Sequence, residues 1–168
     1  MSMKEISFEQ LQMNPFTFMK KDCFLIVAPD GEGVNPMTAG WGSFGVLWNK
    51  PVLSVVVRPQ RYTYGLMEQT DTYTIAYFGS ENRDAIRLCG STSGRDTDKM
   101  KACGFTVGEV DGYRYIEQAQ MVICCRKIYV QDMKPECFLD AQLMAQNYPD
   151  NDFHRFYVGE ITKVLVQE

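Results

Sequence analysis

The pattern of hydrophobic and polar positions predicts a series of short strands joined by turns. Residues 52–57 form an almost unbroken apolar and β-branched run, which is typical of a strand buried on both faces. Residues 29–33 read Pro-Asp-Gly-Glu-Gly, a strong turn signal, and they predict a hairpin between the runs on either side. The other predicted strands are residues 23–28, 34–38, 71–78, 113–130 and 153–166, the last interrupted at Gly159.

The predicted helices are short and fall irregularly between the strands. Residues 7–21 indicate one or two helices divided by Pro15, because proline is tolerated at the first position of a helix. The other predicted helices are residues 62–69, residues 81–88 with Gly90 as terminator, a helix through Ala102 that Gly104 ends, and a weakly helical segment at 135–152. Regular alternation of strand and helix is missing. The pattern therefore predicts one domain over residues 1–168, a mainly antiparallel β-barrel with short helices packed outside.

Composition and charge narrow the classes of partner. The chain has 168 residues, of which 45% are hydrophobic and 23% charged, and its net charge is −4. The basic residues are dispersed, so nucleic acid is not expected as a partner. No apolar run approaches membrane-spanning length and the N-terminus lacks the apolar core of a signal peptide. A cytoplasmic protein without membrane contact is expected.

The cysteines and the single histidine do not form the pattern of a metal site. Six cysteines are present and none forms C-x-x-C, so no zinc set is expected. In a reducing compartment they are expected to be free thiols, mostly buried as small apolar residues. Cys124 and Cys125 are adjacent on a predicted strand and should point to opposite faces of the sheet.

Residues 35–63 hold the strongest functional signal. Small residues alternate there with two tryptophans, an apolar run follows, and the segment ends in two arginines and a hydroxyl. Glycines allow backbone groups to approach a ligand closely, and arginine forks match phosphate oxygens. This order suits a phosphorylated aromatic cofactor, with its ring at one end of the segment and its anion at the other.

A dinucleotide-binding motif in this segment is rejected on its context. Residues 40–45, Gly-Trp-Gly-Ser-Phe-Gly, satisfy G-x-G-x-x-G. That fingerprint requires a helix directly after it and an acidic residue about 20 positions on. Pro51 follows too soon for a helix, and Gln60 stands where the acid is required. We interpret these glycines as part of a strand connection.

Two loops favour anion binding. Arg58, Arg61 and Thr63 lie within six positions, before a predicted helix. Residues 91–99 supply Ser93, Arg95 and Lys99. The alternatives are solvated arginines in the first loop and, in the second, a helix cap formed by Asp96 or Thr97 followed by a surface lysine.

Several other candidates have a structural alternative as well. Asn35, Thr38 and Trp41 suit contacts to a ring edge or a sugar-like chain, or else a hairpin end with a core tryptophan. His154 is the only histidine, and a lone histidine beside a strand is more often structural.

Five stretches taken together resemble the flavin reductase-like family of FMN-binding split-barrel proteins, and its flavoredoxin-like branch in particular. The resemblance runs in order from about residue 23 to the C-terminus. One departure is at residues 36–39, Pro-Met-Thr-Ala, where the family more often has Thr or Ala before Met and Ser after Thr. The matching stretches are residues 35–41, 48–51, 58–63, 89–99 and 154–161.

The resemblance implies a six-stranded antiparallel split β-barrel with short flanking α-helices, a homodimer, and one FMN per subunit near the dimer interface. It places His154 near the flavin ring, as the single candidate for a catalytic role. The implied contacts to the ring and ribityl chain are Asn35, Met37, Thr38, Ala39 and Trp41. The implied phosphate contacts are Arg61, Thr63, Ser93 and Lys99, with Arg58 and Arg95 near them.

Three functions fit this resemblance. The first is an NAD(P)H-dependent flavin reductase, an oxidoreductase in which the flavin carries the redox chemistry. The second is a flavoredoxin-type FMN electron carrier that exchanges electrons with a redox protein and has no pyridine-nucleotide activity of its own. The third is a flavin-binding module without turnover.

Overall fold

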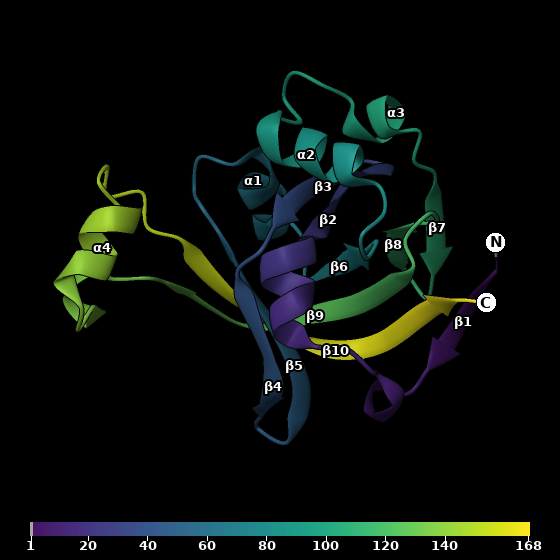
Figure 1. Ribbon diagram of the computed structural model, residues 1–168, viewed down its shortest axis with the longest axis horizontal. Coiled ribbons are helices and arrows are strands. Elements are labelled where there is room, and N and C mark those ends of the chain that lie inside the picture. Colours follow the sequence, from purple (N-terminus) through teal and green to yellow (C-terminus); the bar gives the residue numbers. More distant parts are fainter. Residues whose placement is uncertain (1) are drawn as a thin grey trace.

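The computed structural model describes residues 2–168, and its centre is one curled antiparallel sheet of eight strands (Figure 1). The strand order is β3-β2-β6-β9-β10-β5-β4, and β1 pairs with β10 at the side. β3 and β4 end this order without pairing with each other, so the sheet does not close. The strands are β1 Met3–Ile6, β2 Phe24–Asp30, β3 Gly33–Ala39, β4 Gly42–Leu47, β5 Lys50–Val57, β6 Thr72–Tyr77, β9 Met121–Asp132 and β10 Arg155–Gln167, with β7 Val107–Val110 and β8 Tyr113–Ile116 as a separate hairpin.

The predicted fold class is confirmed, although the number of strands is larger than expected. The protein is mainly β, and every strand pair is antiparallel. Ten strands are described in residues 2–168 in place of six. The sequence pattern missed β1, β4 and β7, and it read β8 and β9 as one strand. The glycines that were interpreted as a strand connection lie mostly in β4, which is almost wholly exposed. β1 and β7 have only four residues each and bury little of their length. Strands this short carry too few positions for a period of two to stand out.

The sheet separates two hydrophobic clusters, as the sequence pattern requires. Residues 52–57 of β5 are all buried, which confirms the prediction for this strand. Cys125 packs in one cluster with Phe18, Leu53 and Tyr73, whereas Cys124 packs in the other. The two neighbouring cysteines therefore do point to opposite faces. All six cysteines are free thiols, although only three are fully buried.

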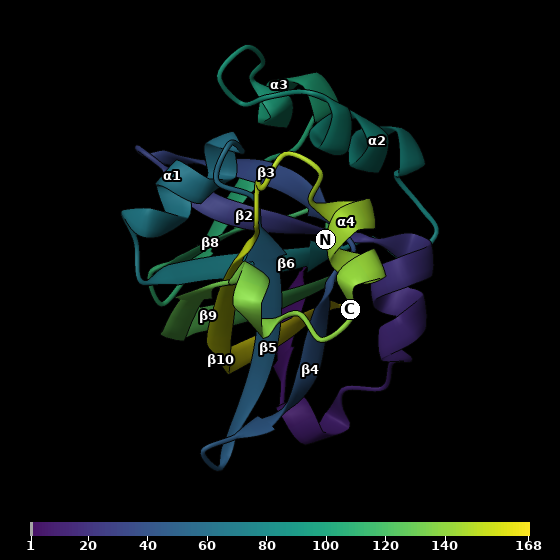
Figure 2. The same cartoon turned by 90° about the vertical axis from the view of Figure 1, so that its left-hand side faces the viewer.

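Three short helices lie along the β2–β3 end of the sheet (Figures 1 and 2). Gly90 lies inside α2 and does not terminate it, which corrects the prediction. A Cβ at Gly90 would lie 3.2 Å from the Cβ of Thr38, so this glycine lets α2 approach β3 closely. The helices are α1 Tyr62–Glu68, α2 Arg83–Ser91 and α3 Lys99–Cys103, and Gly104 ends α3 with a positive φ as predicted.

The loop before α3 also differs from the prediction. Asp98 caps the helix by accepting a hydrogen bond from the backbone N–H of Lys101, so neither Asp96 nor Thr97 is the N-cap. Lys99 is buried and is not a surface lysine. Three consecutive residues, Asp96, Thr97 and Asp98, are all good caps, and local sequence does not choose among them.

Two further segments flank the barrel. The N-terminal segment forms a short 3-10 helix, Phe8–Gln10, and a π-helix, Thr17–Asp22, on either side of Pro15, as predicted. Residues 133–154, called the arm below, connect β9 to β10 and carry the 3-10 helix Pro135–Cys137 and α4, Ala141–Asn147. In Figure 1 the ends of β9 and β10 extend beyond the barrel and hold α4 apart from it. Within residues 2–168 no helix is long and apolar enough to cross a membrane.

Candidate functional site

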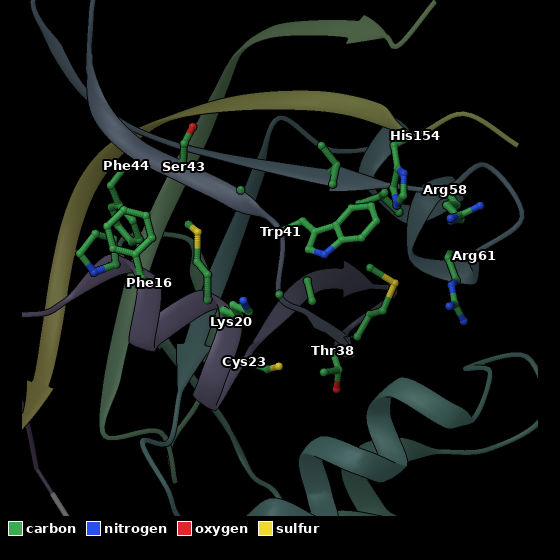
Figure 3. Close-up of a pocket in the computed structure, with 18 residues that line it drawn as sticks. Phe16, Lys20, Cys23, Thr38, Trp41, Ser43, Phe44, Arg58, Arg61 and His154 are labelled. Carbon is green, nitrogen blue, oxygen red and sulfur yellow. The ribbon is translucent and has the colours of Figure 1, made fainter. Parts of the chain in front are cut away.

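A large cavity lies between the π-helix, the end of β3 and the C-terminal end of the arm at His154 (Figure 3). Its volume is about 920 Å³. Consecutive segments of the chain line it, namely the end of β3, the turn at Gly40 and Trp41, the beginning of β4 and the end of β5. The side chains and backbone that line it come from Pro15, Phe16, Met19, Lys20, Cys23, Met37, Thr38, Ala39, Gly40, Trp41, Gly42, Ser43, Phe44, Val56, Val57, Arg58, Arg61 and His154.

A smaller cavity of about 210 Å³ adjoins the large one. Met37 and Arg61 line both, so the two cavities meet at these residues. The rest of its wall comes from the beginning of α1, the end of α2 and the loop before α3. These residues are Gln60, Tyr62, Thr63, Cys89, Ser91, Thr92, Ser93, Gly94, Arg95 and Lys99.

The charges on the walls of the two cavities have one sign. Lys20, Arg58 and Arg61 line the large cavity, and Arg61, Arg95 and Lys99 line the small one. No Asp or Glu is among the described residues that line either cavity. The whole chain has a net charge of −4, so this concentration of positive charge is local. A recess lined by one sign of charge attracts a ligand of the opposite sign.

Lys99 is held at the base of the small cavity. Only 4% of its surface is exposed, and its Nζ donates hydrogen bonds to the backbone carbonyls of Pro36 and Cys89, both at 3.0 Å. Burial is the main cause of the lowered pKa of Lys99. An ammonium group has three N–H donors, so one remains for a ligand in the cavity.

The side chains of Thr63 and Asn35 are joined by a hydrogen bond beside Lys99. Asn35 Nδ2 donates to Thr63 Oγ1 at 2.9 Å, and both side chains are buried. Thr63 lines the small cavity, whereas Asn35 lies behind it and lines neither cavity. A Cβ at Gly94 would lie 2.1 Å from Asn35 Oδ1, so only glycine lets the loop pass this close. Asn35 therefore orients Thr63 and positions the loop.

Three further polar residues surround the small cavity at its surface. The guanidinium of Arg61 forms no hydrogen bond or ion pair with residues 2–168, which leaves all its donors for a ligand. Arg95 lies over the ring of Tyr62 at 5.4 Å and donates to the carbonyl of Gln60. Ser93 Oγ accepts a hydrogen bond from the backbone N–H of Arg95. The structure thus brings together Arg61, Thr63, Ser93, Arg95 and Lys99, as the sequence predicted.

Arg58 contacts the arm, a structural role that the sequence did not indicate. Its guanidinium forms an ion pair with Asp152, donates to the carbonyl of Asn147 at 2.8 Å and lies over the ring of Tyr148 at 5.1 Å. Every one of these contacts is to the arm. Arg58 therefore attaches the arm to the end of β5, although it also lines the large cavity.

His154 and Trp41 form one side of the large cavity. Their rings lie 5.3 Å apart between centroids, and Tyr148 Oη lies 2.8 Å from His154 Nδ1. Burial, with a further contribution from the nearby Arg58, lowers the pKa of His154 to about 4. The imidazole is therefore neutral at pH 7, and it forms no ion pair with any carboxylate of residues 2–168. This environment suits contact with an uncharged ring.

Three further predicted ring contacts, Met37, Thr38 and Ala39, also line the large cavity, whereas Asn35 does not. Met37, Thr38 and Ala39 follow one another on β3, and Thr38 Oγ1 donates to the carbonyl of Ile86 in α2. Trp41 is 51% exposed, so it is not the core residue that the structural alternative predicted. Residues 37–39 of β3 therefore form one wall of the large cavity, and the indole of Trp41 forms another.

Three residues of the N-terminal segment that were not predicted to belong to the site also line the large cavity, namely Phe16, Met19 and Lys20. Their spacing is i, i+3 and i+4, which places three side chains on one face of a helix. The segment was predicted to be helical, so this spacing was a usable signal. It lies outside the stretches that resemble the family, which begin at about residue 23.

Comparisons with known proteins agree with this geometry. The family model described as flavin reductase like domain matches residues 17–168. A search of curated proteins found no match. Among solved structures, flavoredoxin from Methanosarcina acetivorans is 23% identical with a TM-score of 0.70, covering 95% of this chain and 76% of its own.

Two other solved structures share the fold. An FMN-binding protein from Thermus thermophilus, solved with bound p-hydroxybenzaldehyde, is 21% identical with a TM-score of 0.67, covering 98% of this chain and 82% of its own. The NADH:FAD oxidoreductase of Streptomyces globisporus is 15% identical with a TM-score of 0.64, covering 87% of this chain and 76% of its own.

Proposed function

The chain belongs to the family of flavin reductase like domains, and on this premise we propose that it binds FMN and acts as an NAD(P)H-dependent flavin reductase. The observation that carries the proposal is the junction of the two cavities at Met37 and Arg61. The large cavity, about 920 Å³, has room for a flat ring system, and the small one, about 210 Å³, is surrounded by donors. One phosphorylated ring compound fits both at once.

The donors of the small cavity fit a phosphate monoester. Lys99 and Arg61 supply charged donors, and Thr63 and Ser93 supply hydroxyls. A volume of about 210 Å³ suits a single phosphate better than the pyrophosphate and adenosine of FAD. This size supports FMN as the preferred flavin. FAD is used by the Streptomyces globisporus relative, so it is the first competitor to test.

The flavin, when bound, supplies the hydride chemistry between nicotinamide and acceptor, and the chain supplies binding and orientation. Trp41 and His154 cover apolar ring surface on one side of the cavity. His154 is neutral at pH 7, so it adds no charge beside the ring. We assign it the role of positioning the ring and excluding water there, without an obligatory proton transfer.

Steady-state oxidation of NADH and NADPH by the FMN-loaded protein tests this proposal. A reductase shows turnover with free flavin or another acceptor. An electron carrier takes up electrons from dithionite or a redox protein and shows no turnover with either nucleotide. His154→Ala should still be reduced by dithionite with FMN bound. Complete loss of reduction in that variant would contradict the role given to His154.

We also propose that the protein is a homodimer, and the arm supports this. Leu139 and Leu143 on the arm are exposed, and Leu139 retains all its accessible surface. Trp48 and Tyr129 form another exposed apolar pair, 6.1 Å apart between ring centroids. Exposed apolar surface of this extent on a projecting segment is typical of an interface between subunits.

Light scattering tests the dimer directly. The native protein should have about twice the chain mass of 19.2 kDa. Replacing both Leu139 and Leu143 by Asp should shift it towards the monomer, because two charges would enter an apolar contact. Gln142→Asp, an exposed change on the same helix, is the matched control. A monomeric native protein with FMN bound would contradict the dimer. The cytoplasmic location stays a prediction.

A further inference from the structure

The proposed flavin site does not explain one end of the large cavity. In Figure 3, Arg58, Arg61 and His154 lie on one side of Trp41, and Phe16, Phe44 and Lys20 lie on the other. The first side adjoins the phosphate cavity through Arg61. The second side has no such neighbour, and its wall is mostly apolar, with Phe16 and Phe44 as its aromatic residues and Lys20 as its one cation.

The aromatic wall is accessible to a ligand. Phe16 is 79% exposed, an unusual degree for a phenylalanine beside a cavity, and Phe44 is half-buried. Phe44 is held edge-on against the buried ring of Phe18, with 5.4 Å between centroids. Together with Met19 and Pro15 they give a surface suited to a flat apolar molecule.

Lys20 is the only charged residue described on this side of the cavity. It forms no ion pair or hydrogen bond with residues 2–168. The neighbouring carboxylate of Asp22 is already occupied, because it accepts hydrogen bonds from Tyr77 and Arg83. Lys20 therefore presents an unpaired cation beside an apolar wall, and the complementary ligand group is an anion.

The two ends of the cavity differ in the kind of anion that they suit. At the phosphate end, two guanidinium groups and a buried ammonium converge with hydroxyl groups. At the other end a single ammonium stands on a flexible stem, and it is a point charge without the bidentate geometry of arginine. A dianionic phosphate requires more donors than this. A carboxylate, with one negative charge, matches Lys20 alone.

We propose that this end of the cavity binds a planar aromatic monocarboxylate, with its ring between the flavin and the Phe16–Phe44 wall and its carboxylate at Lys20. The inference rests on the proposed function, because the flavin forms one side of the subsite. It goes further by naming the chemical class of the second reactant or competing ligand. Phe16, Phe44 and Lys20 then determine specificity for that molecule.

Difference spectra of the FMN-loaded protein test the inference, because a ring stacked on flavin perturbs its visible absorbance. Benzoate is the probe, titrated at constant ionic strength. Benzamide has the same shape without the charge, and cyclohexanecarboxylate has the charge without the flat ring. The subsite predicts that benzoate binds more tightly than both.

Lys20→Met and Lys21→Met form the matched pair of variants. Both remove an exposed lysine of the π-helix, but only Lys20 lines the cavity. Lys20→Met should weaken benzoate binding about fivefold or more and leave benzamide binding unchanged. Lys21→Met should change neither. Phe16→Ala should weaken the binding of both aromatic probes.

The outcomes separate this inference from the proposed function. If FMN does not bind, the proposed function fails and the subsite fails with it. If FMN binds and benzoate leaves the spectrum unchanged, only the subsite is wrong. An equal loss of benzoate affinity in Lys20→Met and Lys21→Met also overturns it. The inference is also overturned if Lys20→Met raises the KM for NADH and leaves benzoate binding unaffected, because Lys20 would then contact the nucleotide phosphates.

Discussion

The two joined cavities differ in how firmly their polar groups are held. In the small cavity, Lys99 is tied to two carbonyls and Thr63 to Asn35, and all three side chains are buried. In the large cavity, Trp41 is half-exposed and Lys20 has no partner among the described residues. Pre-formed donors bind a fixed group with little ordering cost, whereas an open wall admits molecules that come and go. The small cavity is therefore suited to retain the anionic group of a cofactor, and the open end of the large cavity at Lys20 is suited to exchange reactants.

The largest effect is expected from Lys99→Met, which removes the central donor of the firmly held cavity. Affinity for FMN should fall at least about tenfold, since a charged hydrogen bond is worth about 1.5–3 kcal/mol. The free energy of unfolding should also fall, by roughly 1–3 kcal/mol, because the carbonyls of Pro36 and Cys89 lose their donor. Flavin fluorescence titration and denaturant unfolding measure the two effects.

Lys101→Met is the control for this variant, because Lys101 lies on the same short helix with its side chain exposed. It should change neither quantity appreciably. If the two variants behave alike, Lys99 acts through net charge and not through its position in the cavity.

Arg61→Ala separates ligand binding from stability. Its guanidinium forms no hydrogen bond or ion pair with residues 2–168, so the free energy of unfolding without flavin should stay within about 0.5 kcal/mol. Affinity for FMN should nevertheless fall by roughly tenfold. Arg87→Ala, an exposed arginine outside both cavities, is the matched control. A large loss of stability in Arg61→Ala would mean that this end of the cavity is also held together by Arg61.

The pH dependence of stability tests the environment of His154. Its pKa is about 4 when folded and near 6.5 when unfolded, so the unfolded chain takes up a proton first as the pH falls. Between pH 7 and pH 5 this residue should lower the free energy of unfolding by roughly 1–2 kcal/mol. His154→Gln should lack that part of the decline. Identical pH profiles for the two proteins would show that the imidazole is not buried as described.

Sequence reasoning predicted most of the strands and the two loops that line the small cavity, because each of these features has a local sequence pattern. The buried run of β5 and the turn at 29–33 are examples. Of the residues expected near a phosphate, Arg61, Thr63, Ser93, Arg95 and Lys99 line the small cavity, and Arg58 does not. The resemblance to a known family supplied the link between the two loops, which are separated in the chain by β6 and α2.

Contacts between residues far apart in the chain determine the side-chain partners that sequence patterns did not predict. Asn35 was expected at the ring or ribityl chain, and in the structure its amide donates to Thr63, a residue 28 positions later. Arg58 was expected near the phosphate of a cofactor, and in the structure its guanidinium forms an ion pair with Asp152 of the arm. Lys99 is buried because α2 and β3 both supply carbonyls to it. None of these partners is a neighbour in sequence, so periodicity and capping rules do not identify them.

Titration of the native protein with FMN and with riboflavin tests the central claim most directly, because the two ligands share the ring and differ by the phosphate. If one flavin occupies both cavities, FMN should bind at least about a hundredfold more tightly, since riboflavin forfeits several charged hydrogen bonds in the small cavity. Arg61→Ala and Lys99→Met should each narrow this difference. Equal affinity for FMN and riboflavin in the native protein would contradict the account.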